Sequence, residues 1–188
     1  MILVTGGLGF IGSHTVVSLQ EKGHEVLIVD DLSNATVEVL DGIEAASGIR
    51  SRFEELNLQN SVGVAEIFQA YNITGIIHFA AAKAVGESVQ KPIAYYQNNL
   101  GSLLNLLAEI EKSHKPIPFI FSSSCTVYGE AETLPVTERA PIQPAMSPYG
   151  NTKQVGEEIL VDTVNALEGF RVISLRYFNP IGANASNA

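Results

Sequence analysis

The feature that most constrains the fold is a glycine-rich segment directly after the first apolar run of the chain. Residues 2–5 have the composition of a short buried strand, and Gly6, Gly9 and Gly12 follow at a spacing of three. An amphipathic stretch at residues 11–22 then predicts a helix. Glycine lets the backbone approach a diphosphate closely, and the N-terminus of a helix directs free N–H groups at such an anion. Strand, glycine turn and helix in this order predict a dinucleotide-binding unit rather than a ligand-free turn.

The rest of the chain alternates short apolar runs with longer amphipathic stretches. Runs rich in Val, Ile, Leu and Phe, without strict polar alternation, are typical of strands buried on both faces. We expect strands at residues 2–5, 25–30, 75–79, 119–123 and 171–177, with a weaker one at 52–58. We expect helices at residues 11–22, 62–71, 92–112 and 148–167, and a loop over the proline-rich residues 135–148. This pattern predicts an α/β fold, a doubly wound Rossmann-type parallel sheet with helices on both faces.

The composition narrows the classes of partner. The 188 residues contain 20 Asp and Glu against 11 Lys and Arg, a net charge of -9, which argues against nucleic acid as a partner. One Cys is too few for a disulfide scaffold or a multi-cysteine zinc site, and no metal site is expected. No apolar run approaches the roughly 20 residues of a membrane span. The N-terminus has no signal-peptide pattern, so we expect a cytoplasmic protein without a membrane partner.

Two carboxylates follow the second expected strand. Asp30 lies 18 residues after Gly12, close to the roughly 20 residues expected for the acid that binds the ribose 2′-hydroxyl of a dinucleotide. Asp31 is its neighbour. Since a carboxylate at this place repels a 2′-phosphate, the sequence favours NAD over NADP as the cofactor.

A second group of chemically active residues follows the strand expected at 119–123. Ser124 lies just after that strand, where hydroxyls face the ligand site of such a sheet. Tyr149 and Lys153 lie four residues apart near the start of a helix, and therefore on one face of it. A tyrosine with a pKa of about 10 acts as a base near neutral pH only if a neighbouring cation lowers that pKa by roughly 3 units. Ser124, Tyr149 and Lys153 are therefore the predicted catalytic residues.

These residues, together with three longer segments, resemble the extended short-chain dehydrogenase/reductase family of NAD-dependent epimerases and dehydratases. The shared general features are the segment at residues 5–12, Ser124, and Tyr149 with Lys153. The more specific segments are residues 78–88, 95–99 and 176–183. These segments resemble the nucleotide-sugar 4-epimerases within the family, and the similarity extends over the whole chain.

The resemblance implies NAD as cofactor, a UDP-sugar as substrate and a homodimer as the assembly. The implied activity is 4-epimerisation of a UDP-hexose, UDP-glucose or UDP-galactose, by transient oxidation at C4. The implied substrate contacts are Lys83, Ser124, Tyr149 and Asn179. The implied cofactor contacts are Gly6, Gly9, Phe10, Ile11, Gly12, Asp30, Asp31, Leu32, Ser33, Asn34, Asn57, Leu58, Phe79, Ala80, Ala81, Lys83, Asn98, Ser122, Tyr149, Lys153, Tyr177 and Phe178.

Three positions separate this chain from its wider family. Asn57 stands where the family usually has an Asp that contacts adenine, and we expect its amide oxygen to accept from the adenine amino group. Cys125 and Thr126 stand where the 4,6-dehydratases of the family carry an Asp-Glu pair. A thiol and a hydroxyl do not perform that acid and base chemistry at neutral pH, so epimerisation is the better interpretation than elimination of water.

Two alternatives remain open at the level of sequence. One is an epimerase for another nucleotide sugar, an N-acetylhexosamine or uronate form. The other is an NAD-binding fragment without catalysis, since we expect residues 1–183 to form the NAD-binding domain and 184–188 to begin a truncated substrate-binding region. Charged residues make up 16% of the chain, against about 25% in a typical soluble domain. Part of the surface is therefore expected to be covered by a partner subunit or by further chain.

Overall fold

The computed structural model describes residues 1–184. Of the truncated region expected at 184–188, all but its first residue lies outside the described residues. The strands are β1 (Ile2–Thr5), β2 (Val26–Asp30), β3 (Arg52–Glu55), β4 (Gly75–His78), β5 (Phe119–Ser124) and β6 (Val172–Tyr177). The helices are α1 (Phe10–Glu21), α2 (Val39–Ser47), α3 (Ser61–Ala70), α4 (Val85–Gln90), α5 (Pro92–Ser113) and α6 (Pro148–Ala166), with a 3-10 turn η1 (Cys125–Tyr128).

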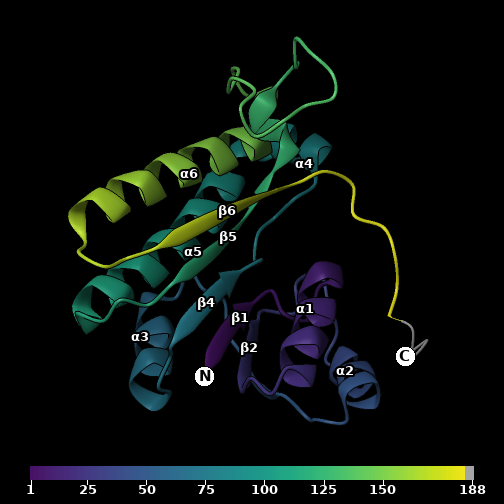
Figure 1. Cartoon of the computed structure of the whole chain (residues 1–188), viewed down its shortest axis with the longest axis vertical. Helices are drawn as coiled ribbons and strands as arrows, with labels where there is room; N and C mark the ends of the chain where they lie inside the picture. The colour runs from purple at the N-terminus through teal and green to yellow at the C-terminus, as the bar shows by residue number, and fades with distance from the viewer. Residues whose placement is uncertain (185–188) are drawn as a thin grey trace.

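The strands form one parallel sheet in the order β3-β2-β1-β4-β5-β6 (Figure 1). The chain proceeds outward from β1 through β2 to β3, then returns to the other side of β1 for β4, β5 and β6. The predicted doubly wound Rossmann-type sheet is therefore confirmed. The carboxyl ends of β1 and β4 border the point where the strand order reverses, which is where such sheets bind their ligands.

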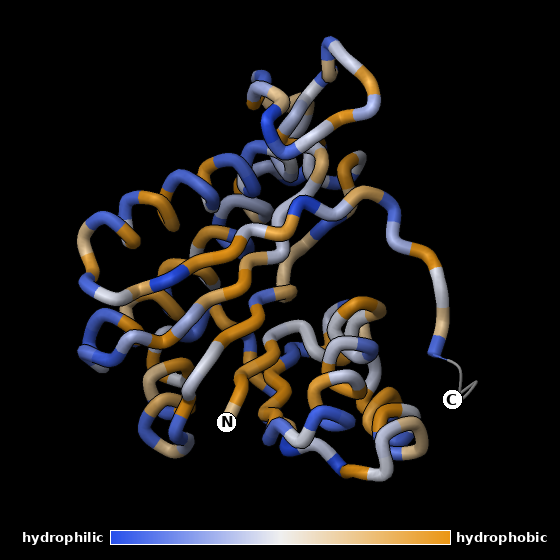
Figure 2. Tube along the Cα trace, viewed as in Figure 1, coloured by the Kyte–Doolittle hydropathy of each residue, from blue (hydrophilic) through white to orange (hydrophobic). Residues whose placement is uncertain are grey.

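The sheet separates two apolar layers because neighbouring strand residues point to opposite faces. On β1, Leu3 belongs to the layer formed with α3, α5 and α6, and Val4 to the layer formed with α1 and α2. Both side chains are fully buried. Figure 2 shows the strands as the most continuously hydrophobic part of the chain, with the helices on either side alternating between apolar and polar residues.

The sheet is covered unevenly. The helices α1 and α2 lie over β1 and β2, whereas β6 at the edge has no helix over the face that carries Ile173 and Leu175 (Figure 1). Their side chains are 59% and 38% exposed. Exposed apolar side chains on an edge strand agree with the expectation that part of this surface is covered by other chain. None of the helices within residues 1–184 is long and apolar enough to cross a membrane.

Two helices were not predicted from the sequence. Helix α2 is nine residues long and buries only Leu40 and Ile43, so its periodic signal is short. Helix α4 has six residues and begins within the segment 78–88. The expected strand at residues 52–58 is shorter than predicted and ends at Glu55.

Candidate active site

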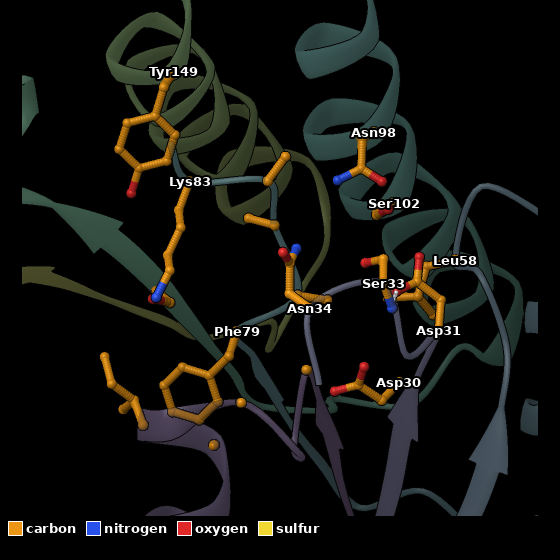
Figure 3. Close-up of a pocket in the computed structure, with 18 of the residues that line it drawn as sticks. Asp30, Asp31, Ser33, Asn34, Leu58, Phe79, Lys83, Asn98, Ser102 and Tyr149 are labelled. Carbon is orange, nitrogen blue, oxygen red and sulfur yellow. Dashed lines mark hydrogen bonds between the residues drawn. The ribbon is translucent and has the colours of Figure 1, made fainter. Parts of the chain in front are cut away.

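The carboxyl ends of the strands surround a cavity of about 1100 Å³. Figure 3 shows Asp30 and Asp31 on one side of it and Tyr149 and Lys83 on the other, with Phe79 between them. Every residue predicted to contact cofactor or substrate lines this cavity, with the single exception of Leu32. Leu32 instead packs against the α1–α2 layer, and its N–H donates to Asp30 Oδ1 at 3.1 Å. It supports the site through its backbone, since its side chain points away from the cavity.

Some lining residues were not predicted from the sequence. Tyr95 and Ser102 lie three residues before and four after Asn98 on α5, and all three line the cavity. The helical spacing from Asn98 was a signal that could have found them. Glu87, Lys91, Gln59 and Ser123 are polar lining residues that carried no comparable signal. Within residues 1–184, no three His, Cys, Asp or Glu side chains are grouped as metal ligands.

The glycine loop leaves no room for side chains at the floor of the cavity. A Cβ added at Gly6 would lie 2.7 Å from the backbone nitrogen of Ala80, and one at Gly12 would lie 2.2 Å from the Gly6 carbonyl oxygen. Gly9 is the N-cap of α1, makes no side-chain cap, and is followed by a first turn without acidic residues. The N-terminus of α1 is thus open to an anion, as the diphosphate of a dinucleotide requires.

Asp30 is a buried carboxylate at the end of β2. Its Oδ2 accepts from the N–H of Leu8 at 3.1 Å and its Oδ1 from the N–H of Leu32 at 3.1 Å. Burial raises the pKa of this carboxyl, and the two backbone hydrogen bonds oppose that rise. Asp30 therefore ties the glycine loop to the loop after β2 while it lines the cavity.

Asn57 lines the cavity, and its side chain makes two contacts within the protein. Its Nδ2 donates to Asp31 Oδ2 at 3.1 Å, and its Oδ1 accepts from the N–H of Gln59 at 2.9 Å. Since an amide oxygen has two lone pairs, the contact with the adenine amino group stays a prediction. The observed contribution of Asn57 is to orient the Asp31 carboxylate at the rim of the cavity.

The other end of the cavity is formed by the start of α6. Ser147 is the N-cap of this helix, and its hydroxyl accepts from the N–H of Gly150 at 3.1 Å. The next residues place Tyr149 and Lys153 on the face toward the cavity, with the Lys153 ammonium 5.9 Å from the centre of the Tyr149 ring. The Ser124 hydroxyl lies beside the Tyr149 phenol and lowers its pKa. The three predicted catalytic residues are therefore adjacent, as the sequence indicated.

The electrostatics of this group are those of a buried site. Lys153 is 4% exposed, its Nζ donates to the Ser122 carbonyl at 2.8 Å, and burial lowers its pKa to about 8. Burial also raises the pKa of Tyr149, against a smaller lowering by the Ser124 hydroxyl. The expected lowering of the Tyr149 pKa is thus absent from the protein alone. A base at Tyr149 needs additional positive charge, and the cation of an oxidised nicotinamide supplies charge of that sign.

The lowered pKa of Lys153 predicts how stability depends on pH. Between about pH 8 and the usual pKa of about 10.4, the unfolded chain binds a proton at this lysine that the native chain has lost, so the free energy of unfolding rises with pH. In Lys153→Met this contribution disappears. Urea unfolding at pH 7 and pH 9.5 should show a gain for the wild type relative to the variant of about 2 kcal/mol. An equal response to pH in both chains would contradict a buried, deprotonating Lys153.

Comparisons with known proteins agree with this geometry. Residues 2–188 match the model of the NAD dependent epimerase/dehydratase family. The UDP-glucose 4-epimerase of Erwinia amylovora is 48% identical over 98% of this chain and 55% of its own length. The crystal structure of UDP-glucose 4-epimerase from Bifidobacterium longum, in complex with NAD+ and UDP, has a TM-score of 0.95 at 43% identity, and the match covers 98% of this chain and 55% of that one.

The name of a third relative includes two substrates. The structure of the UDP-Glc/GlcNAc 4-epimerase from Campylobacter jejuni has a TM-score of 0.88 at 37% identity, and the match covers 94% of this chain and 53% of that one. In all three comparisons the chain spans about half the length of the relative that it matches.

Proposed function

Because the chain belongs to the NAD dependent epimerase/dehydratase family, we propose that it carries the cofactor-binding and catalytic half of a UDP-hexose 4-epimerase. One observation carries the proposal. A single cavity joins an open helix N-terminus and paired carboxylates at one end to a Ser124, Tyr149 and Lys153 cluster at the other. The first end fits a diphosphate and a ribose, and the second fits proton transfer at a sugar hydroxyl.

NAD, when bound, supplies a hydride acceptor and donor for C4 of the sugar. Tyr149 takes the proton of the 4-hydroxyl and returns it, while the Ser124 hydroxyl bonds the same oxygen and holds it in line. The Lys153 ammonium, fixed by the Ser122 carbonyl, favours the phenolate form of Tyr149. Oxidation and re-reduction take place at C4 alone. The reaction therefore needs a base and a hydrogen-bonding partner only at the 4-hydroxyl, and Tyr149 and Ser124 supply them.

The residues after Ser124 support this reaction over loss of water. Cys125 and Thr126 begin the turn η1, and the N–H of Thr126 donates to the Ser124 hydroxyl oxygen at 3.2 Å. Neither side chain supplies a carboxylic acid for the departure of a sugar hydroxyl. The sugar of the substrate is either a hexose or an N-acetylhexosamine. The second remains an alternative because the relative from Campylobacter jejuni is named for both.

The purified chain tests the proposal directly. We expect NAD to remain bound through gel filtration, and we expect conversion of UDP-galactose to UDP-glucose, measured by separation of the two nucleotide sugars. UDP-N-acetylgalactosamine and UDP-glucuronate are the comparison substrates. Bound NAD without conversion or binding of any of these sugars would favour the alternative of a cofactor-binding module. A chain that binds neither NAD nor a UDP-sugar would contradict both.

The carboxylates after β2 predict a preference for NAD over NADP. A 2′-phosphate placed against Asp30 or Asp31 meets like charge, which should weaken NADP binding about 100-fold relative to NAD. Replacing the acid that meets the ribose, by Asp30→Ser or Asp31→Ser, should reduce this preference at least about tenfold. The exposed Asp162→Ser on α6 is the matched control. Calorimetric titration with both dinucleotides measures the effect, and a preference unchanged in both variants would contradict the assignment.

We also propose that α5 and α6 pair with the same helices of a second chain. The two helices pack together, and their inner residues Leu103 and Leu160 are fully buried. On their outer surface Leu104 is 49% exposed and Val161 59% exposed. Sedimentation equilibrium of the wild type and of Leu104→Glu should give a dimer and a monomer, respectively. A monomeric wild type would refute this pairing.

A further inference from the structure

Glu157 is a buried carboxylate for which the reaction has no evident use. It lies on α6 four residues after Lys153 and eight after Tyr149, so the three share one face of the helix. Its side chain is largely hidden from solvent, with the residue 9% exposed. A buried carboxylate is costly unless it is paired and hydrogen-bonded, so its partners indicate what it does.

Those partners come from two neighbouring strands. The Ser123 hydroxyl of β5 donates to Glu157 Oε1 at 2.5 Å. Arg176 of β6 donates from Nε to Oε1 at 3.0 Å and from Nη2 to Oε2 at 2.6 Å. Ser123 and Arg176 are also partners in the parallel register of β5 and β6. One carboxylate on α6 therefore bonds to two adjacent strands at their carboxyl ends. We call these contacts of Glu157 with Ser123 and Arg176 the Glu157 clasp.

The same strand end holds the catalytic residues. Two residues of β5 bond to the α6 face: the Ser122 carbonyl accepts from Lys153, and the Ser123 hydroxyl donates to Glu157. The next residue, Ser124, lies beside the Tyr149 phenol. Since each contact lies at a different height along α6, together they fix the helix against sliding along β5. The Glu157 contact is the one that involves a full ion pair.

The backbone of α6 lies close to the sheet at Gly156. A Cβ at this position would lie 2.9 Å from the Phe121 ring, so the residue adds no side chain to the packing of the helix on the sheet. Leu160, one turn further along, packs in the same apolar layer as Phe121, and the polar contacts of Glu157 add bonds of defined direction to that packing.

We propose that Glu157 is a positioning residue. Held between Ser123 and Arg176, it fixes α6 against the end of β5 and so sets where Tyr149 and Lys153 stand in the cavity. Replacing a buried ion pair by apolar groups is often neutral or favourable for stability. We therefore assign the pair of Glu157 and Arg176 a role in positioning the helix rather than in stabilising the fold. The inference deepens the proposed function and rests on it for the role of Tyr149 as the base.

The consequence is measurable at Tyr149. The Ser124 hydroxyl favours the phenolate of Tyr149, and a helix released from its position moves the phenol away from that hydroxyl. We therefore expect the acid ionisation constant of Tyr149 to fall when the Glu157 clasp is cut. The other titratable groups that face this region are His78 on β4, Lys83 after β4, Tyr95 on α5, Cys125 and Tyr128 on η1, and Arg176 and Tyr177 on β6.

The direction in which the ionisation constant of Tyr149 changes distinguishes an effect of helix position from an effect of charge. Cutting the clasp with Glu157→Ala also leaves the Arg176 guanidinium unpaired, and added positive charge alone would raise the ionisation constant of a nearby phenol. Ser123→Ala removes the strand contact and leaves the ion pair intact, so it changes position without changing charge. Glu158→Ala, an exposed carboxylate one residue further along α6, is the matched control.

The experiment is an ultraviolet difference titration of the phenolate band in the 188-residue chain. Subtracting the curve of the same chain with Tyr149→Phe isolates Tyr149, and urea unfolding confirms that each variant is folded. We expect an ionisation constant about tenfold lower in Glu157→Ala, lower by a smaller factor in Ser123→Ala, and unchanged in Glu158→Ala. If Glu157→Ala does not fold, Ser123→Ala decides alone.

An unchanged or raised ionisation constant in the folded clasp variants would overturn the inference. The titration is repeated with NAD, which should raise the ionisation constant of Tyr149 in the wild type through its nicotinamide cation. Failure of NAD to bind, or to shift that curve, counts against the proposed function. The difference between clasp variants and wild type without NAD remains the test of Glu157, so the two failures are distinguishable.

Discussion

Tyr149→Phe is expected to lower epimerisation by about 1,000-fold while NAD binding stays within a few-fold of the wild type. The change removes one hydroxyl and keeps the ring, so the packing of α6 against η1 is preserved. What disappears is the atom that we propose takes and returns the proton of the sugar hydroxyl, and a positioned general base contributes roughly 10²–10⁴ to a rate. Steady-state conversion of UDP-galactose and titration with NAD measure the two quantities separately.

The contrast with Tyr177 makes this prediction specific. Tyr177 also lines the cavity, its ring is 6.4 Å from that of Phe79, and burial raises its pKa. Tyr177→Phe therefore removes a cavity phenol without removing the hydroxyl beside Ser124, and we expect a loss well below about 100-fold. Nearly full activity of Tyr149→Phe, or equal losses in the two variants, would rule out Tyr149 as the base.

The second large effect is expected at Gly12. A methyl group at this position would stand 2.2 Å from the Gly6 carbonyl oxygen and 2.8 Å from the Gly7 Cα. Both neighbours are backbone atoms, so relief requires the glycine loop to move away from α1. We expect Gly12→Ala to lower the free energy of unfolding by about 3 kcal/mol and to weaken NAD binding by about 100-fold or more.

Gly86→Ala is the matched control for this change. Gly86 lies within α4, and a Cβ there meets nothing within 4 Å. Alanine in a helix interior is favoured over glycine by about 0.5–1 kcal/mol, so this variant should be unchanged or slightly more stable. Urea unfolding and NAD titration of both variants give the comparison. Wild-type stability of Gly12→Ala would show that the loop accommodates a side chain, against the geometry described above.

Much of the fold was predictable because its signals are local. The runs that became β1, β2, β4 and β5 are largely buried. They are apolar except at their carboxyl ends, and a short apolar run is the pattern that indicates a buried strand most clearly. Helix α6 was indicated by Ser147 and Pro148, an N-cap followed by a proline in the first turn. These features depend only on residues adjacent in sequence.

The less predictable parts depend on tertiary partners. Helix α1 buries the polar Gln20 along with Gly12, Val16 and Val17. Gln20 is accommodated because its amide donates to Ser51 at 2.9 Å and accepts from Ser47 at 2.8 Å. A polar residue on a buried helix face cannot be recognised without knowing which distant side chains satisfy it.

The candidate site shows the same division. The positions of the catalytic residues followed from helix spacing and from the rule that ligands bind at the carboxyl ends of parallel strands. The protonation of Tyr149 did not follow, because its pKa depends on how deeply the phenol is buried. Asn57 was assigned to the cofactor from the family resemblance, and the contacts of its side chain with Asp31 and Gln59 are invisible in a linear sequence.

The hydrogen bond between Asn57 and Asp31 has a consequence for the charge at the rim of the cavity. An amide that donates to a carboxylate can be exchanged for a carboxylate that accepts from an amide, so Asp31→Asn combined with Asn57→Asp would preserve the contact with the roles reversed. Asn57→Asp alone would replace this hydrogen bond with two like charges about 3 Å apart. Since an Asp is the residue that the family resemblance leads one to expect at this position, Asn57 leaves the rim of the cavity with one negative charge fewer and a donor in its place.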